Sequence, residues 1–239
     1  MVNKMLLFVG NLFDDVPMGN MPVFGLENRR YLGCKSKLAE WILSIINNEA
    51  QGAYSFFDIF AGTGAIGRKA LEYYQEVIFN DFLCSNVVSY KAFFADGELN
   101  KERVQDFIRE MNNVDASSLD GNYCSHYYGN KYFGMEAAKK IGYIRDEIEI
   151  RKNEFSEKEY FVLVASLIYS ADRIANTTGQ FEAYRKNPAR FKDLDMRMVD
   201  AKCYKGVKIY NEDANVLARR VKCDIVYMDP PYNSRQYCS

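Results

Sequence analysis

Four consecutive residues near the end of the sequence, Asp229-Pro230-Pro231-Tyr232, combine a carboxylate, two rigid prolines and an aromatic ring. They follow an apolar, β-branched run at residues 224–228, which predicts a buried strand. Because proline fixes φ and has no N–H to donate, the chain must leave the sheet here. The carboxylate and the freed carbonyls can accept hydrogen bonds from the exocyclic amine of a nucleic-acid base, on which Tyr232 can stack. Taken alone, these residues also suit an ordinary turn.

A glycine-rich turn forms a second candidate site, after a strand predicted at residues 54–58. Asp58 ends the strand, Gly62, Gly64 and Gly67 follow, and a helix is predicted to begin near Ala65. Glycines allow the backbone to approach a ligand closely. The G-x-G-x-x-G spacing is a weak signal by itself, since dinucleotide-binding proteins also use it. The Asp58 carboxylate would repel a pyrophosphate and attract an ammonium group, so we favour a ligand that carries an amine.

The next predicted strand ends in Asn80-Asp81-Phe82. An acid at this position can accept hydrogen bonds from both hydroxyls of a ribose. Phe82 can pack on an adenine. The alternative is that Asn80 and Asp81 merely cap the strand. The glycine-rich turn one helix upstream favours ribose binding.

Tyr31 and Lys35 lie in a turn before a predicted helix, for which Ser36 is the expected N-cap. A lysine at a helix N-terminus is disfavoured by the helix dipole, which makes an anionic ligand reasonable. On this stretch alone, a solvated lysine is the simpler interpretation. The apolar positions at helical spacing are Leu38, Trp41, Ile42, Ile45 and Ile46.

Composition sets the limits on these interpretations. The chain has 239 residues, 48% of them hydrophobic and 26% charged, with a net charge of −1, as expected of a soluble globular protein. Any basic surface for nucleic acid must therefore be local. The six cysteines are scattered and His126 is the only histidine, so we expect no metal site, reduced thiols and a cytoplasmic location. No apolar run is long enough to span a membrane.

The middle of the chain is mainly helical, with helices predicted at residues 101–111, 134–152 and 156–176. Basic and aromatic residues then interleave, as in surfaces that contact phosphates and bases. The alternative is an amphipathic helix followed by a solvated basic loop. A strand at residues 206–210 and a short helix at residues 216–221 return the chain to the sheet. The candidate DNA-binding residues are Arg173, Asn176, Tyr184, Arg185, Lys186 and Arg190.

Taken together, these motifs resemble the D12 class of DNA adenine-N6 methyltransferases, from about residue 29 to the end. The resemblance implies S-adenosylmethionine as cofactor and double-stranded DNA as partner. It also implies that Asp229, Pro230, Pro231 and Tyr232 form the catalytic loop, with no metal. The cofactor-binding residues that it implies are Tyr31, Lys35, Asp58, Phe60, Ala61, Gly62, Gly64, Asp81, Phe82, Asp213 and Ala214.

The same resemblance implies an α/β fold: a Rossmann-like class I methyltransferase sheet with an inserted, mainly helical target-recognition region. We divide the chain into an N-terminal arm with little packed structure (1–24), a cofactor-binding part (25–95), the helical insertion (96–205) and a return to the catalytic domain (206–239). In the implied chemistry, Asp229 and the Pro230 carbonyl accept the two N6 hydrogens of a flipped adenine. Asp58 faces the cofactor's ammonium, and Lys35 pairs with its carboxylate.

One feature departs from the family pattern, in which the sheet continues past the catalytic loop. The strand at residues 225–228 is apolar on both faces and expects neighbours. We therefore expect a second chain or a missing C-terminal segment to complete the sheet, and low activity from this chain alone. Methylation of RNA or of cytosine N4, and a non-catalytic cofactor- or DNA-binding subunit, are alternatives. A nicotinamide oxidoreductase is the weakest alternative, since it leaves the Asp-Pro-Pro-Tyr motif unexplained.

Overall fold

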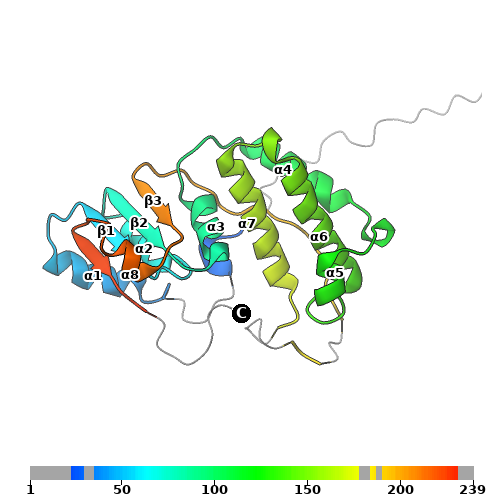
Figure 1. Cartoon of the computed structure of the whole chain (residues 1–239), viewed down its shortest axis with the longest axis horizontal. Coiled ribbons are helices and arrows are strands. Elements are labelled where there is room, and N and C mark those ends of the chain that lie inside the picture. Colours follow the sequence, from blue (N-terminus) through cyan, green and yellow to red (C-terminus); the bar gives the residue numbers. More distant parts are fainter. Residues whose placement is uncertain (1–22, 30–34, 178–183, 187–189, 231–239) are drawn as a thin grey trace, which may run out of the picture.

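A computed structural model describes residues 23–29, 35–177, 184–186 and 190–230. Within these ranges the chain forms one parallel sheet beside a group of helices, as Figure 1 shows. The sheet order is β3-β2-β1-β4. The strands are β1 (Ser55–Asp58), β2 (Glu76–Asn80), β3 (Val207–Tyr210) and β4 (Ile225–Tyr227).

The strand order places β1 between β2 and β4. β1 pairs in parallel with β2 on one side and with β4 on the other, so that Phe57 lies opposite both Ile78 and Val226. The order of the strands reverses between β1 and β4, which is where open α/β sheets bind ligands at the carboxyl ends of their strands. The predicted α/β fold is therefore confirmed.

Alternating side chains of the strands face two different layers. Phe56, Val77 and Phe79 belong to the large core, against α1 (Ala39–Glu49), α2 (Ala65–Ala70) and α3 (Cys84–Phe93). On the other face, Phe57 and Ile78 form a small cluster with Leu217 of α8 (Ala214–Leu217). These two layers fix the ends of β1 and β2, where the candidate site lies.

Gly67 allows α2 to approach β2 closely. A Cβ atom at this position would lie 2.2 Å from the ring of Phe79, which is fully buried. Alanine normally stabilises a helix relative to glycine. We nevertheless expect Gly67→Ala to lower the free energy of unfolding by roughly 1–3 kcal/mol, because the packed ring cannot move away. Denaturant unfolding measures this change.

Gly121→Ala is the matched control, since the nearest atom to a Cβ there is at 3.8 Å. That variant should unfold at nearly the wild-type denaturant concentration. A Gly67→Ala protein as stable as the wild type would show that the packing of α2 on Phe79 is looser than described.

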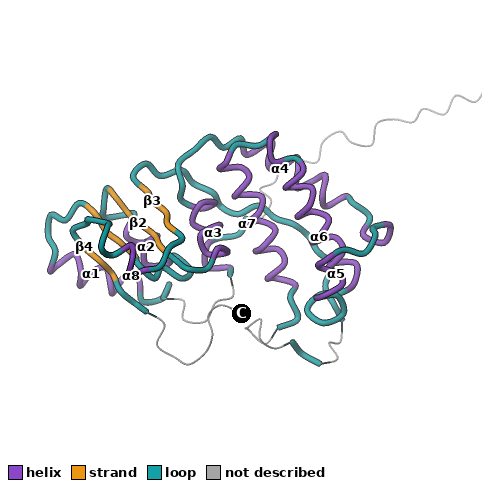
Figure 2. The backbone as a smooth tube through the Cα atoms, in the orientation of Figure 1, coloured by secondary structure: helices purple, strands orange, loops and turns teal. Residues whose placement is uncertain are grey.

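The helical region lies beside the sheet in Figures 1 and 2. Its long helix α7 begins at a capping box, in which Ser156 and Glu159 each bond the backbone of the other. Within the part of the chain that the structure describes, no helix is long and apolar enough to cross a membrane. The elements are α4 (Lys101–Asn113), α5 (Tyr123–Tyr128), α6 (Met135–Ile150) and α7 (Glu157–Ile174), with short 3-10 turns at Leu26–Asn28, Ala116–Ser118 and Lys152–Glu154.

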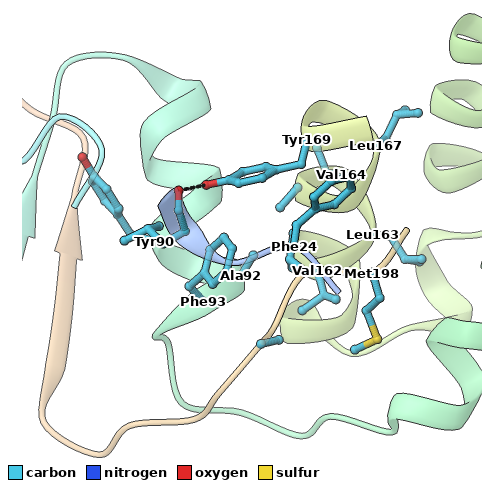
Figure 3. Close-up of a cluster of buried hydrophobic side chains, with 14 of the residues drawn as sticks. Phe24, Tyr90, Ala92, Phe93, Val162, Leu163, Val164, Leu167, Tyr169 and Met198 are labelled. Carbon is cyan, nitrogen blue, oxygen red and sulfur yellow. Dashed lines mark hydrogen bonds between the residues drawn. The ribbon is translucent and has the colours of Figure 1, made fainter. Parts of the chain in front are cut away.

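A continuous core joins the helical region to the sheet region. Figure 3 shows Phe93 of α3 against Tyr169 of α7, with their ring centroids 5.5 Å apart, and Phe24 packed beside them. Phe24 is buried and pairs with Val199 as an isolated β-bridge. We assigned Phe24 to an unpacked arm; its burial corrects that assignment, and residues 1–22 lie outside the described ranges.

The start of α1 also differs from the prediction. The N-cap is Leu38 rather than Ser36, because residues 35–38 form a separate turn closed by the Leu38 N–H on the Lys35 carbonyl. Ala39 and Leu43 are the residues of α1 that are buried, whereas Trp41 is 62% exposed. Of the residues at helical spacing, Ile42 and Ile46 pack on the core as expected, whereas Leu38, Trp41 and Ile45 are exposed.

Candidate active site

At the carboxyl end of the sheet, the Asn80 side chain at the end of β2 hydrogen-bonds the segments that follow β1 and β3. Its side-chain Nδ2 donates to the carbonyls of Ile59 and Glu212, each at 3.1 Å, and its Oδ1 accepts from the Glu212 N–H. Asn80 is buried, so these bonds are shielded from water. The sequence drew attention to the Asn80-Asp81 pair but gave the role to Asp81. Asn80 is thus a positioning residue that sequence reasoning missed.

The glycine-rich turn adopts a conformation that favours glycine at two positions. Gly62 has φ of 54° and Gly64 has φ of 78°, both in the left-handed region. The Gly62 N–H donates to Asp81 Oδ2 at 2.8 Å, and the Gly62 carbonyl accepts from the Tyr90 hydroxyl at 2.5 Å. The turn is therefore held from both sides, by β2 and by α3.

Asp81 follows β2 and uses both carboxylate oxygens within the protein. Oδ2 accepts from Gly62, and Oδ1 accepts from the Leu83 N–H at 2.8 Å. Each oxygen keeps a second lone pair, so two hydroxyls of a ribose can still bind. Phe82 beside it is 71% exposed. The Asn211 side chain fixes this segment by donating to the Asp81 and Phe82 carbonyls.

Asp58 is the most unusual group of the site. It is buried; its Oδ2 accepts the Gly67 N–H at 3.2 Å, while Oδ1 has no hydrogen-bond partner among the described residues. Burial raises the pKa of the Asp58 carboxyl to about 8; the Gly67 N–H opposes this rise, and the carboxylates of Asp81 and Asp229 add to it. A buried, unpartnered carboxylate oxygen fits a cationic donor such as an ammonium group.

Lys35 and Asp229 form an ion pair within the candidate site. Lys35 Nζ lies 2.7 Å from Asp229 Oδ2, and each side chain is about a quarter exposed. The sequence placed both residues in the site but paired Lys35 with a ligand carboxylate. The direct ion pair was not anticipated, because the two residues are far apart in the sequence. It links the segment before α1 to the end of β4.

The remaining residues predicted to bind a cofactor lie around this centre. Asp213 is exposed and caps α8, with its Oδ1 accepting the N–H groups of Asn215 and Val216. Phe60 and Ala214 pack on the small cluster under α8, and Ala61 is buried at the start of the glycine-rich turn. Tyr31, Pro231 and Tyr232 lie outside the described residues.

Comparison with known protein families identifies the family of this chain. Residues 31–239 match the family described as D12 class N6 adenine-specific DNA methyltransferase. The chain belongs to this family. The D12 match includes every segment of the site described above, from Lys35 to Asp229.

Curated relatives of this D12 chain carry methylase names. It is 36% identical to type II methyltransferase M.CviAII of Paramecium bursaria Chlorella virus 1 and 34% identical to M.NlaIII of Neisseria lactamica, covering 87% of the chain and 65% of each relative. It is 32% identical to modification methylase StsI of Streptococcus sanguinis, over 34% of that protein. The chain thus spans less than two thirds of these relatives.

The residues predicted to bind DNA in this D12 protein fall into two groups. Arg173, Arg185, Lys186 and Arg190 are exposed. Asn176 instead holds the fold, since its Nδ2 donates to the carbonyls of Lys131 and Arg185, each at 2.9 Å. Both amide hydrogens of Asn176 are therefore used within the protein, and its place among the DNA-binding residues stays a prediction.

Tyr184 joins this basic segment to the helical region. Thr177 and Tyr184 form an antiparallel bridge, and the Tyr184 ring packs edge-on against Tyr132 with their centroids 5.3 Å apart. Tyr184 is therefore held against the helical region by both its backbone and its ring.

Proposed function

We propose that this chain takes part in the transfer of a methyl group from S-adenosylmethionine to adenine N6 in double-stranded DNA, as a modification methylase. Family membership supports the reaction class. The observation that carries the proposal is the convergence of Asp58, Asp81 and Asp229 at the carboxyl ends of the adjacent strands β1, β2 and β4. An ammonium, a ribose and an exocyclic amine are the three groups that these carboxylates suit.

The residues present fit the cofactor. The unpartnered Asp58 Oδ1 would hold the ammonium group, and Asp81 would hold the ribose hydroxyls. Phe82 would pack on the adenine ring of the cofactor, with Asp213 beside it. When bound, the cofactor supplies an electrophilic methyl group, so the protein need only orient and polarise the acceptor.

Asp229 and the Pro230 carbonyl then act on the acceptor amine. The N6 lone pair of adenine is delocalised into the ring, which makes the amine a poor nucleophile. Accepting both N–H bonds localises the lone pair toward the methyl group. Lys35 Nζ forms an ion pair with Asp229 Oδ2. We infer that Lys35 moves onto the cofactor carboxylate when the site fills and releases Asp229 for the base.

Transfer of labelled methyl groups tests the proposal. The chain is incubated with labelled S-adenosylmethionine and unmodified duplex DNA, with RNA and N6-premethylated DNA as parallel acceptors, and the methylated nucleoside is identified after digestion. Label in N6-methyladenine from duplex DNA is the expected product. Label in RNA or in N4-methylcytosine would replace the proposed acceptor, and cofactor binding without transfer would favour a non-catalytic subunit.

We also infer that further polypeptide pairs with β4. Among the described strands, β4 is bonded on one side only, by β1. Val226 is 45% exposed and Met228 67% exposed, although apolar parallel strands are normally covered on both faces. Activity of the 239-residue chain alone should therefore be well below that of M.CviAII assayed alongside it. Equal turnover would contradict this inference.

A further inference from the structure

Two asparagines at neighbouring strand ends each bind the backbone that follows the other strand. β2 and β3 lie side by side in Figure 1, and β2 ends at Asn80. Beyond the last strand pair, Asn80 bonds both the N–H and the carbonyl of Glu212, each at 3.1 Å. In return, Asn211 Nδ2 donates to the Asp81 carbonyl at 2.7 Å and to the Phe82 carbonyl at 3.0 Å. We call Asn80 and Asn211 the asparagine pair.

The Asn211 amide is oriented by a third contact. Its Oδ1 accepts a hydrogen bond from the Cys84 thiol at 3.2 Å, so its amino group faces the two carbonyls. Asn211 is exposed, whereas Asn80 is buried. Water can therefore bind the carbonyls that Asn211 reaches, and the fold does not depend on Asn211 to satisfy them. What Asn211 adds is a fixed position of the loop after β2 relative to the loop after β3.

The two loops carry the groups proposed to hold the adenosine half of the cofactor. Asp81 and Phe82 follow β2, and Asp213 follows β3. Each loop is also held locally, since Asp81 accepts from the Gly62 N–H and Asp213 caps α8. Neither of these local contacts joins one loop to the other, whereas the asparagine pair does. The asparagine pair therefore fixes the spacing between the ribose group and the adenine group of the site.

We propose that Asn211 is a positioning residue that sets the affinity for the adenosine half of S-adenosylmethionine, by holding the loop after β2 against the loop after β3. This proposal rests on the proposed function, which supplies the cofactor. A slot whose two walls are already in place binds its ligand without the cost of ordering them, so loss of the contact weakens binding. Asp58 and Lys35 lie outside the two loops, and their contacts with the methionine half are unaffected.

Calorimetric titration with S-adenosylmethionine tests this role. Asn211→Ala should raise the Kd roughly 5- to 50-fold, because two hydrogen bonds that order the loop are lost. Asn211→Asp keeps the shape of the side chain and the bond from Cys84 but cannot donate, so its Kd should rise at least as much. Asn153→Ala is the control and should bind like the wild type. Asn153 is exposed in the turn Lys152–Glu154, and its side chain makes no hydrogen bond to the described residues.

Two further variants distinguish positioning from a general loss of order. In Phe82→Ala, a group that Asn211 holds in place is already missing, so adding Asn211→Ala should raise the Kd by a clearly smaller factor than in the wild type. In Asp58→Asn, which alters only the methionine half, Asn211→Ala should raise the Kd by the same factor as in the wild type. A merely structural role for Asn211 would give equal factors in both variants.

The possible outcomes separate this inference from the proposed function. If the wild type binds S-adenosylmethionine and Asn211→Ala binds it equally well, or if the factors in Phe82→Ala and Asp58→Asn are equal, this inference alone is wrong. If the wild type does not bind S-adenosylmethionine, the proposed function fails as well. Denaturant unfolding checks each variant. Should Asn211→Ala fail to fold, the Kd of Asn211→Asp decides; failure of both to fold would make Asn211 a structural residue and overturn the inference.

Discussion

Replacing Asp229 with alanine should lower the rate of methyl transfer by on the order of 10²- to 10³-fold, because the acceptor amine loses the group that localises its lone pair. S-adenosylmethionine affinity should change only a few-fold, since Asp229 lies at the end of β4 rather than in the glycine-rich turn. The substitution removes the ion pair between Lys35 and Asp229, whose charged atoms are 2.7 Å apart. Because both side chains are partly exposed, the protein should remain folded. Single-turnover transfer and cofactor titration on the same sample measure both quantities.

Asp146→Ala is the control for this experiment, since Asp146 is exposed in the middle of α6 and takes part in none of the ion pairs found among the described residues. It should transfer methyl groups at the wild-type rate. If Asp229→Ala retained full activity, Asp229 would not be the acceptor of the amine hydrogens, and the catalytic assignment would be wrong. Loss of cofactor binding in Asp229→Ala would place Asp229 in the cofactor site instead.

Replacing Asp58 with asparagine should weaken S-adenosylmethionine binding roughly 10- to 100-fold, the worth of a charge-assisted hydrogen bond. The two side chains have nearly the same shape, and asparagine Oδ1 can still accept the Gly67 N–H. The variant should therefore keep the fold of the glycine-rich turn. Calorimetric titration at several pH values gives the affinity and the protons exchanged.

The pH dependence of this binding follows from the buried carboxyl. The pKa of Asp58 is raised to about 8 in the ligand-free protein, so below that pH a cationic ligand must displace a proton. Affinity should rise as the pH increases from 6 toward 8, with proton release. Above about 8 the α-amino group of the cofactor itself loses its charge, and affinity should fall again. Asp58→Asn should lack the rising limb.

The same shift has a consequence for stability. The folded protein binds the Asp58 proton up to about pH 8, whereas the unfolded chain releases it near its ordinary pKa of 3.8. Stability contributed by Asp58 is therefore lost as the pH rises from about 4 to 8, relative to Asp58→Asn. A wild-type protein that matched the variant at every pH, in both stability and affinity, would contradict the burial of an ionisable group at this position.

Local sequence determined where the chemistry can occur. The left-handed backbone at positions 62 and 64 favours glycine, and β4 ends two residues before Asp229, so both features are visible in the sequence. Apolar runs and strand-end acids predicted the parallel α/β sheet, and the family resemblance that these motifs carry was confirmed. Each of these features depends on residues within a few positions of one another.

The tertiary structure alone decided the partners of those residues. Lys35 and Asp229 are far apart in the sequence. Their ion pair forms because β4 pairs with β1, which brings Asp229 to the candidate site. Asn176, a predicted DNA-binding residue, donates hydrogen bonds to the carbonyls of Lys131 and Arg185, which no local pattern indicated. Burial raises the pKa of the Asp58 carboxyl. The carboxylates of Asp81 and Asp229, which are far from Asp58 in the sequence, raise it further. Contacts between residues far apart in sequence depend on packing, and no local pattern encodes them.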